Sequence, residues 1–249
     1  MASDVSFLPA PWYNAAMYGK EFCKVYNEFG WNYYPEVFGE ELKIWLNKKG
    51  LTPGRALDIG CGTGVLCHIL KDMGIKTTGI DLSEEMIKIA READPGIDFF
   101  TADMVTYRPD TPVNLVTCTG DALNHLPDIS LVETMFKNVH SYISPGGVFV
   151  FDILDGHEGK SEEPFELSPI GDTRVILQIT KDEKNITLHV SGYKGDSLEF
   201  EEKVVETYYH PDHIISALKD AGFKNITCGD RLNPEREGHG TSLFLTARK

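Results

Sequence analysis

The sequence has no long apolar run and few basic residues, and each shortage excludes a class of protein. No stretch approaches the roughly 18 apolar residues of a membrane-spanning helix, and the opening MASDVSFLPAPWYN lacks the basic and apolar regions of a secretion signal. Lysine and arginine total 24 against 38 aspartates and glutamates, which gives a formal net charge of −14. Because such a surface repels phosphate backbones and anionic lipid, we expect no nucleic acid and no membrane as partners.

Cysteine is also scarce, and its arrangement argues against disulfides. The five cysteines are odd in number and lack CxxC spacing. We therefore expect free thiols in a reducing, cytoplasmic compartment. The chain of 249 residues, 41% hydrophobic and 25% charged, suits one large domain or one domain with an insertion.

Glycine is informative where it clusters, in the segment Asp58-Ile59-Gly60-Cys61-Gly62-Thr63-Gly64 behind the apolar pair Ala56-Leu57. The pattern predicts a buried strand that enters a glycine turn and then a helix. Glycine allows left-handed backbone conformations and a close approach of a ligand to the main chain. A dinucleotide fingerprint would need its third glycine where this chain has Val65, which argues against a nicotinamide-dependent oxidoreductase.

This segment resembles motif I, D/E-x-G-x-G-x-G, of the class I S-adenosylmethionine-dependent methyltransferases. A second acid agrees with it: Asp81 ends a strand some 20 positions later, where a carboxylate can accept from both ribose hydroxyls of a nucleoside cofactor. The alternative role for Asp81 is a helix cap, for which Ser83 is the better candidate.

The resemblance implies roles for further residues at successive strand ends. Asp103 would accept from the adenine amino group beside the Met104 amide, and Leu82 and Met86 would enclose the ring, although Met86 also suits plain core packing. Thr119 would lie near the methionine part of the cofactor. The expected binding set for S-adenosyl-L-methionine is Asp58, Gly60, Cys61, Gly62, Gly64, Asp81, Leu82, Met86, Asp103, Met104 and Thr119.

Strands and helices alternate from residue 55 to 153, which predicts an α/β fold with a parallel sheet. The expected strands are Arg55–Ile59, Lys76–Ile80, Ile97–Thr101, Val113–Cys118 and Val148–Ile153, with helices at Gly64–Met73, Ser83–Ala93 and Asp128–Ile143 and a turn at Ser144–Gly147. Three alternating segments then predict an inserted antiparallel β meander: Thr173–Lys181, Ile186–Lys194 and Ser197–Tyr208. A helix at Glu36–Leu46 precedes the core, and a helix at Pro211–Ala221 with strands at Phe223–Cys228 and Ser242–Ala247 closes it.

The resemblance implies a Rossmann-like seven-stranded sheet with helices on both faces and its last strand antiparallel. We expect an aromatic, helical lid at 1–50, a cofactor-binding core at 51–156 and 210–249, and an insertion at 157–209 that covers the active site. This layout is similar to that of the glycine and sarcosine N-methyltransferases. Three aromatic residues of the first segment, Tyr18, Tyr26 and Trp31, are candidates, with Trp12, for a lid or a cation–π box, or else they pack on the sheet.

The loop after the fourth strand holds the candidate catalytic groups. His125 is a candidate general base, and Asp121 and Asn124 are candidates for orienting an acceptor. The alternative is a loop that bonds to itself. A magnesium site at Asp152, Asp155, His157 and Glu158 is a further alternative, but acids in such a polar loop are more often solvated, so we expect no metal.

The resemblance therefore implies a methyltransferase, and we expect it to act on a small-molecule acceptor with a nitrogen or oxygen nucleophile. The alternative is a non-catalytic protein that binds S-adenosylmethionine as a sensor or as an assembly subunit. A homodimer is compatible with either reading.

Overall fold

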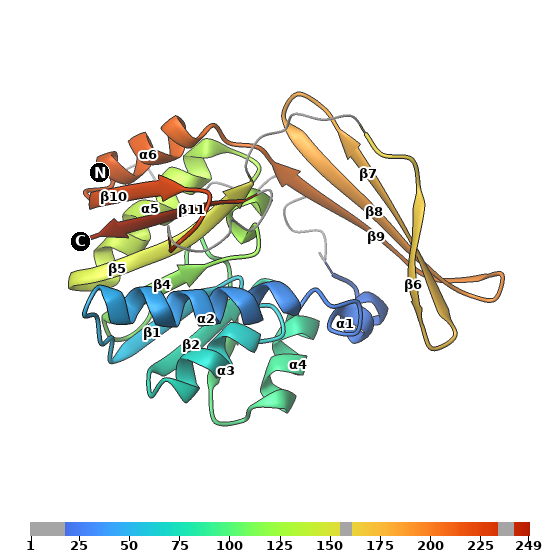
Figure 1. Ribbon diagram of the computed structural model, residues 1–249, viewed down its shortest axis with the longest axis horizontal. Coiled ribbons are helices and arrows are strands. Elements are labelled where there is room, and N and C mark those ends of the chain that lie inside the picture. The colour runs from blue at the N-terminus through green and yellow to red at the C-terminus, as the bar shows by residue number, and fades with distance from the viewer. Residues whose placement is uncertain (1–17, 155–160, 234–241) are drawn as a thin grey trace, which may run out of the picture.

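The computed structural model describes residues 18–154, 161–233 and 242–249, which form two sheets. The larger sheet has seven strands in the order β10-β11-β5-β4-β1-β2-β3, and the smaller has four in the order β6-β7-β8-β9 (Figure 1). Strands of the large sheet are β1 (Arg55–Ile59), β2 (Lys76–Asp81), β3 (Asp98–Thr101), β4 (Val113–Cys118), β5 (Ile143–Leu154), β10 (Lys224–Gly229) and β11 (Ser242–Arg248). Strands of the small sheet are β6 (Phe165–Ile170), β7 (Thr173–Lys181), β8 (Asn185–Lys194) and β9 (Ser197–Thr207).

Strands β1 to β5 pair in parallel, whereas β11 is antiparallel to both β5 and β10. The predicted seven-stranded sheet with its antiparallel closing strand is therefore confirmed. The order changes direction between β1 and β4, and ligands of open α/β sheets bind outside the carboxyl ends of the strands at such a point.

Helices cover both faces of the large sheet because each has one apolar stripe to bury. One face packs against α2 (Tyr33–Lys48), α3 (Val65–Asp72) and α4 (Glu84–Ala93), and the other against α5 (Ile129–Tyr142) and α6 (Pro211–Asp220). The expected N-caps are in place. Ser83 accepts from the Met86 N–H at 3.3 Å, and Asp128 from the Ser130 N–H at 2.8 Å.

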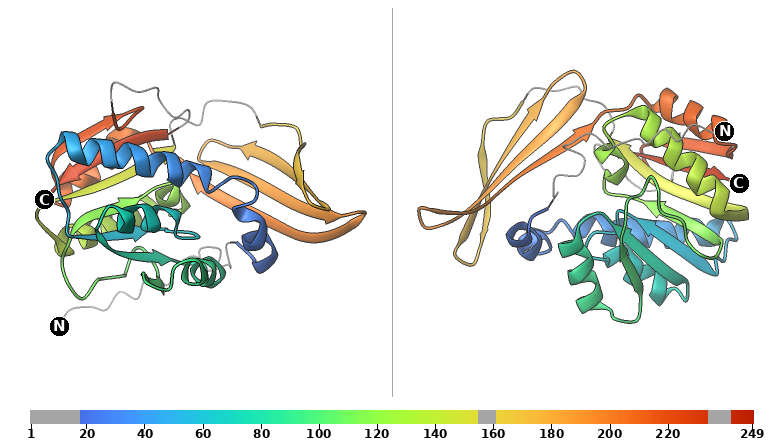
Figure 2. Two further views of the ribbon diagram at one scale, coloured as in Figure 1. Left: turned by 60° about the horizontal axis from the view of Figure 1, so that its bottom comes forward. Right: turned by 180° about the vertical axis from the view of Figure 1, so that it is seen from behind.

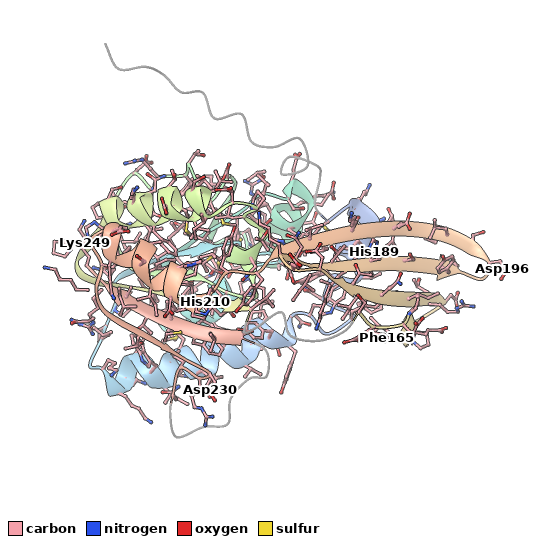
Figure 3. The ribbon with its side chains drawn as sticks, turned by 90° about the horizontal axis from the view of Figure 1, so that it is seen from above. Phe165, His189, Asp196, His210, Asp230 and Lys249 are labelled. Atoms are coloured by element: carbon pink, nitrogen blue, oxygen red, sulfur yellow. The ribbon has the colours of Figure 1, made fainter. Side chains whose placement is uncertain are left out.

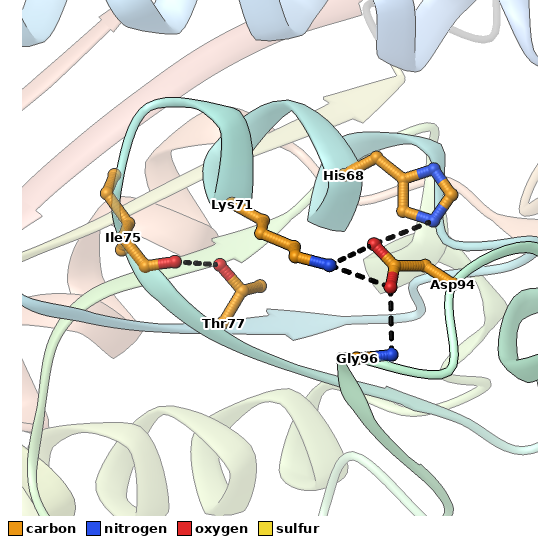
Figure 4. A network of polar contacts seen from close by, with 6 residues as sticks. All are labelled: His68, Lys71, Ile75, Thr77, Asp94 and Gly96. Atoms are coloured by element: carbon orange, nitrogen blue, oxygen red, sulfur yellow. Dashed lines mark hydrogen bonds and ion pairs between the residues drawn. The ribbon is translucent and has the colours of Figure 1, made fainter.

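A surface network ties the end of α3 to the end of α4 (Figure 4). Lys71 Nζ donates to both carboxylate oxygens of Asp94, at 2.7 and 2.6 Å, and the Gly96 N–H donates to the same side chain at 2.8 Å. Asp94 is the C-cap of α4, and the hydrogen bonds from Lys71 hold the pKa of its carboxyl below the usual value. The network links the ends of α3 and α4 at the surface.

The small sheet projects from the core, with the β8–β9 hairpin near Asp196 at its far end (Figures 2 and 3). Helix α1 (Lys20–Tyr26) packs on the inner face of this sheet, where the buried side chain of Phe22 contacts Val175 and Val190. Two segments that are distant in sequence thus form one aromatic and aliphatic cluster next to the carboxyl ends of β1, β2 and β4. Among the residues that the structure describes, no helix is both long and apolar enough to cross a membrane.

Three local features differ from the sequence-based expectations. Strand β6 was not predicted, and its Pro169 is compatible with the edge position that it occupies. Helix α1 is seven residues long, too short for its periodicity to stand out. The expected turn at Ser144–Gly147 lies within β5, because the Gly146 N–H donates to the Lys249 carbonyl at 3.1 Å and so pairs the segment with the chain end.

Candidate functional site

One cavity of about 910 Å³ opens along the carboxyl ends of the parallel strands. Its floor consists of the loops after β1, β2, β3 and β4, and its roof consists of α1 and the inner face of β8 and β9. The cavity is therefore bounded by the core, the N-terminal helix and the small sheet together.

The glycine turn after β1 has the backbone that its sequence predicts. Gly60, Gly62 and Gly64 have φ values of +68°, +51° and +83°, a region that side chains disfavour. A Cβ at Gly62 would meet no atom within 4 Å, so the main chain there is open to a ligand. A Cβ at Gly64 would lie 2.8 Å from the Phe99 ring, so this glycine lets α3 approach β3, and it does not line the cavity.

Asp81 stands at the end of β2 and lines the cavity. Its two carboxylate oxygens accept from the N–H groups of Gly62 and Ser83, each at 2.9 Å, so the side chain holds the glycine turn as well as facing the cavity. Burial raises the pKa of this carboxyl above the usual value. Each oxygen retains capacity for a further donor, which fits the paired hydroxyls of a ribose.

Asp58 lies beneath the turn and is 2% exposed. It accepts from the Thr117 hydroxyl at 2.7 Å and from the Cys67 thiol at 3.4 Å, which joins β1 to β4 and α3. Burial raises the pKa of Asp58 to about 7 against these two hydrogen bonds, which lower it. The residue borders the cavity from below.

The other predicted cofactor residues fall into two groups. Those that line the cavity are Gly60, Cys61, Leu82, Met86, Met104 and Thr119. Met86 is also 1% exposed, so it belongs to the core as well. Asp103 does not line the cavity in this structure, and its Oδ1 accepts from the Val105 N–H at 2.7 Å.

The loop after β4 places two of the three candidate catalytic residues on the cavity wall, His125 and Asp121. Asn124 is fully buried and lies outside the wall. Its amide donates to the Thr207 carbonyl at 2.8 Å and accepts from the Leu154 N–H at 3.2 Å. The side chain is thereby committed to joining β5 and β9, an arrangement that positions the loop and leaves no group to orient an acceptor.

His125 meets the roof of the cavity through its ring. Its Nε2 lies 3.3 Å from the Tyr18 hydroxyl, and burial lowers the pKa of the imidazole to about 4. The histidine is therefore neutral near pH 7. Tyr18 has φ +64°, unusual for an aromatic residue, and its ring meets that of His125 edge-on with centroids 6.0 Å apart.

All three aromatic lid candidates line the cavity: Tyr18, Tyr26 and Trp31. Tyr18 stacks on Phe22 with ring centroids 5.3 Å apart, and Tyr26 meets Trp31 at 5.2 Å. The cluster faces both the cavity and the small sheet, so packing and lining roles coexist. Trp12 lies outside the described residues.

One acid on the cavity wall was not singled out from the sequence for acceptor binding. Glu206, near the end of β9, lines the cavity, and burial together with the nearby Asp121 and Asp152 raises the pKa of its carboxyl to about 8. Burial also raises the pKa of Asp121 to about 6. Glu202, Val204 and Glu206 alternate along β9 and therefore lie on one face, but nothing near them in the sequence indicates that this face meets a cavity.

Asp152 was a candidate metal ligand, and its oxygens serve another purpose. They accept from the N–H groups of Gly120 and Asp121, both at 3.2 Å, and from the Tyr34 hydroxyl. Burial raises the pKa of Asp152 to about 7. The other candidate ligands, Asp155, His157 and Glu158, lie outside the described residues. Among the residues that the structure describes, no group of three side chains could hold a metal ion.

Comparisons with known proteins agree on one family. A family model described as "Methyltransferase domain" matches residues 31–227. A putative methyltransferase of Geobacillus sp. (strain WCH70) is 28% identical over 243 residues, which cover 92% of this chain and 96% of the relative. The glycine N-methyltransferase of Rattus norvegicus is 34% identical over 131 residues, 45% of each chain. Among solved structures, S-adenosylmethionine-bound CalS10, an amino pentose methyltransferase from Micromonospora echinaspora, matches with a TM-score of 0.73 at 18% identity. The match covers 94% of this chain and 99% of CalS10, and it shows that the two proteins share a fold.

Proposed function

Because this chain belongs to the class I S-adenosylmethionine-dependent methyltransferases, we propose that it transfers a methyl group to a nitrogen or oxygen atom of a small molecule. The observation that carries the proposal is the single cavity that joins the glycine turn and Asp81 to the loop after β4 and the aromatic roof. A volume of about 910 Å³ lies within the range of ligand pockets, about 300–1,000 Å³.

The residues of the floor suit the cofactor. Asp81 offers a partly buried carboxylate to ribose hydroxyls, and Gly62 leaves its main chain open to close approach. Leu82, Met86 and Met104 provide apolar and polarisable surface for an adenine ring. S-adenosylmethionine supplies the electrophilic sulfonium methyl group.

The roof serves the acceptor side in this proposal. Methyl transfer by displacement needs the nucleophile held in line and water excluded, which a closed chamber achieves. Tyr18, just before α1, and Tyr26, at its end, line the cavity on one side. Val190 and Val204 line it from the small sheet. A roofed pocket of this volume favours a small molecule over a macromolecular acceptor.

The competing proposal is a non-catalytic protein that binds the cofactor as a sensor. Turnover separates the two. We expect calorimetric titration to show binding of S-adenosylhomocysteine and no binding of NAD. We also expect a labelled methyl group to appear in one pool of amines, phenols, carboxylic acids or thiols. Binding without any transfer supports the sensor, and NAD binding without a response to S-adenosylhomocysteine contradicts both.

A further inference from the structure

The acceptor side of the cavity is rich in carboxyl groups and aromatic rings. Asp121 and Glu206 line it, and Asp152 lies directly behind the loop that carries Asp121. Among the described lining residues one side chain carries a positive charge near pH 7, Lys20, which is exposed. A ligand in this region therefore meets a negative wall.

Glu206 is distinct within this group because it has no assigned task in the fold. Asp152 binds two backbone N–H groups and Tyr34, and Asp121 accepts from the Ser242 hydroxyl at 3.5 Å. Within the described ranges, the Glu206 carboxyl has no hydrogen-bond or ion-pair partner. A carboxyl group brought to the wall of a cavity without a partner costs free energy, which a ligand of opposite charge recovers.

The rings on the opposite side of the cavity suit the same ligand. Tyr18, Tyr26 and Trp31 present aromatic surface within one cluster, and such faces attract cations. His125 does not oppose a cation, because burial keeps the pKa of its ring at about 4 and the ring neutral. Carboxylate and aromatic surface together disfavour a carboxylic acid or a phenolate.

We propose that the methyl acceptor is a primary or secondary amine that enters as an ammonium ion against Glu206, and that Glu206 receives its proton. This inference rests on the proposed methyl transfer and names its acceptor class. An ammonium nitrogen has no free electron pair, so an N–H bond must break before the nitrogen can act as a nucleophile. The proton forms a new O–H bond on Glu206. The freed pair then forms the N–CH₃ bond as the C–S bond of the sulfonium breaks, leaving neutral S-adenosylhomocysteine and a methylated ammonium product, and Glu206 returns its proton to solvent.

The pKa of Glu206 makes it better suited to this step than His125. A base works best when its pKa lies near the operating pH, and the pKa of Glu206 is raised to about 8 whereas that of His125 is lowered to about 4. The charged and titratable groups that face Glu206 are Asp121, Asp152 and the Tyr18 and Tyr26 hydroxyls. A bound cation lowers the pKa of these carboxyl groups, so Glu206 becomes the carboxylate that the step requires.

The test compares Glu206→Gln with Glu201→Gln, an exposed glutamate on the opposite face of the same strand. Each variant is given labelled S-adenosylmethionine with separate pools of aliphatic amines, phenols, carboxylic acids and thiols. We expect label in the amine pool alone. With the best amine of that pool, we expect Glu206→Gln to lower kcat/KM by about 10²- to 10⁴-fold and to lose the alkaline rise of the rate–pH profile. S-adenosylhomocysteine affinity should stay within about twofold in both variants, and Glu201→Gln should behave as the wild type.

The outcomes separate this inference from the function on which it rests. Label in another pool, or cofactor binding with no labelled product, overturns the amine acceptor while leaving cofactor binding intact. Amine methylation with an unchanged rate and pH profile in Glu206→Gln overturns the role of Glu206. Absence of both binding and transfer removes the proposed function itself.

Discussion

We predict that Asp81 binds the cofactor, and replacing this residue gives a quantitative test of that prediction. The Asp81→Ala change removes a carboxylate that accepts two backbone N–H groups at 2.9 Å and lines the cavity. A hydrogen bond to a charged group contributes about 1.5–3 kcal/mol. Since each 1.4 kcal/mol changes an affinity tenfold, S-adenosylhomocysteine should bind about ten- to a hundredfold more weakly.

Isothermal titration calorimetry measures this affinity directly, and pH gives a second signature. Because burial raises the pKa of Asp81, its carboxylate is lost on acidification at a higher pH than for an exposed aspartate. Wild-type affinity should therefore weaken as the pH falls, and this dependence should be smaller in Asp81→Ala. Asp98→Ala, which removes an exposed acid at the start of β3, is the matched control and should bind as the wild type does.

The reasoning is refuted by a folded Asp81→Ala protein, with wild-type circular dichroism, that binds S-adenosylhomocysteine with unchanged affinity. A loss of affinity in Asp98→Ala of the same size would also refute it, because the effect would then follow net charge and not the carboxylate at the site.

Two further predictions concern buried polar groups. Asn124→Leu leaves the Thr207 carbonyl and the Leu154 N–H without partners, at about 1–3 kcal/mol each, so the thermal midpoint should fall by at least about 4 °C; an unchanged midpoint would contradict the assignment. Burial raises the pKa of Asp58 from its usual 3.8 to about 7, so protonation of this residue stabilises the folded state. The stabilisation is fully present below pH 3.8 and is lost as the pH rises through about 7. Asp58→Asn should therefore lose less stability than the wild type between about pH 5 and pH 8 in urea titrations without cofactor, and parallel curves would show that Asp58 does not titrate in this range.

The sequence predicted the core well because its signals are local. The strands Arg55–Ile59 and Val113–Cys118 are buried on both faces and bounded by turn residues, and the structure has them with the same limits. Ser83 and Asp128 mark helix starts because their side chains accept from N–H groups two or three residues ahead. Such features depend on neighbours in the chain.

The roles of the residues around the cavity depend on contacts between segments that are distant in sequence. Nothing around Glu206 in the sequence indicates that it faces Asp121, 85 positions earlier, across a cavity. Asn124 has a side chain suited to acceptor binding, but the arrival of β9 and the end of β5 commits both of its polar atoms. The sequence therefore predicted that residues of the loop after β4 lie near the site. Which of them face the cavity follows only from the tertiary structure.

The attachment of α1 to the cofactor loops has a thermodynamic consequence. The Thr63 hydroxyl in the glycine turn donates to Asn27 at the end of α1 at 2.8 Å, and the Ser83 hydroxyl donates to the Tyr18 carbonyl at 3.5 Å. We therefore expect docking of α1 and occupancy of the turn by the cofactor to be coupled equilibria. If cofactor binding changes the equilibrium constant for docking of α1 by some factor, docking of α1 changes the cofactor's binding constant by the same factor. Release of the spent cofactor and undocking of α1 thus share one free-energy cycle, and we expect a substitution that loosens this helix to weaken binding of the nucleoside.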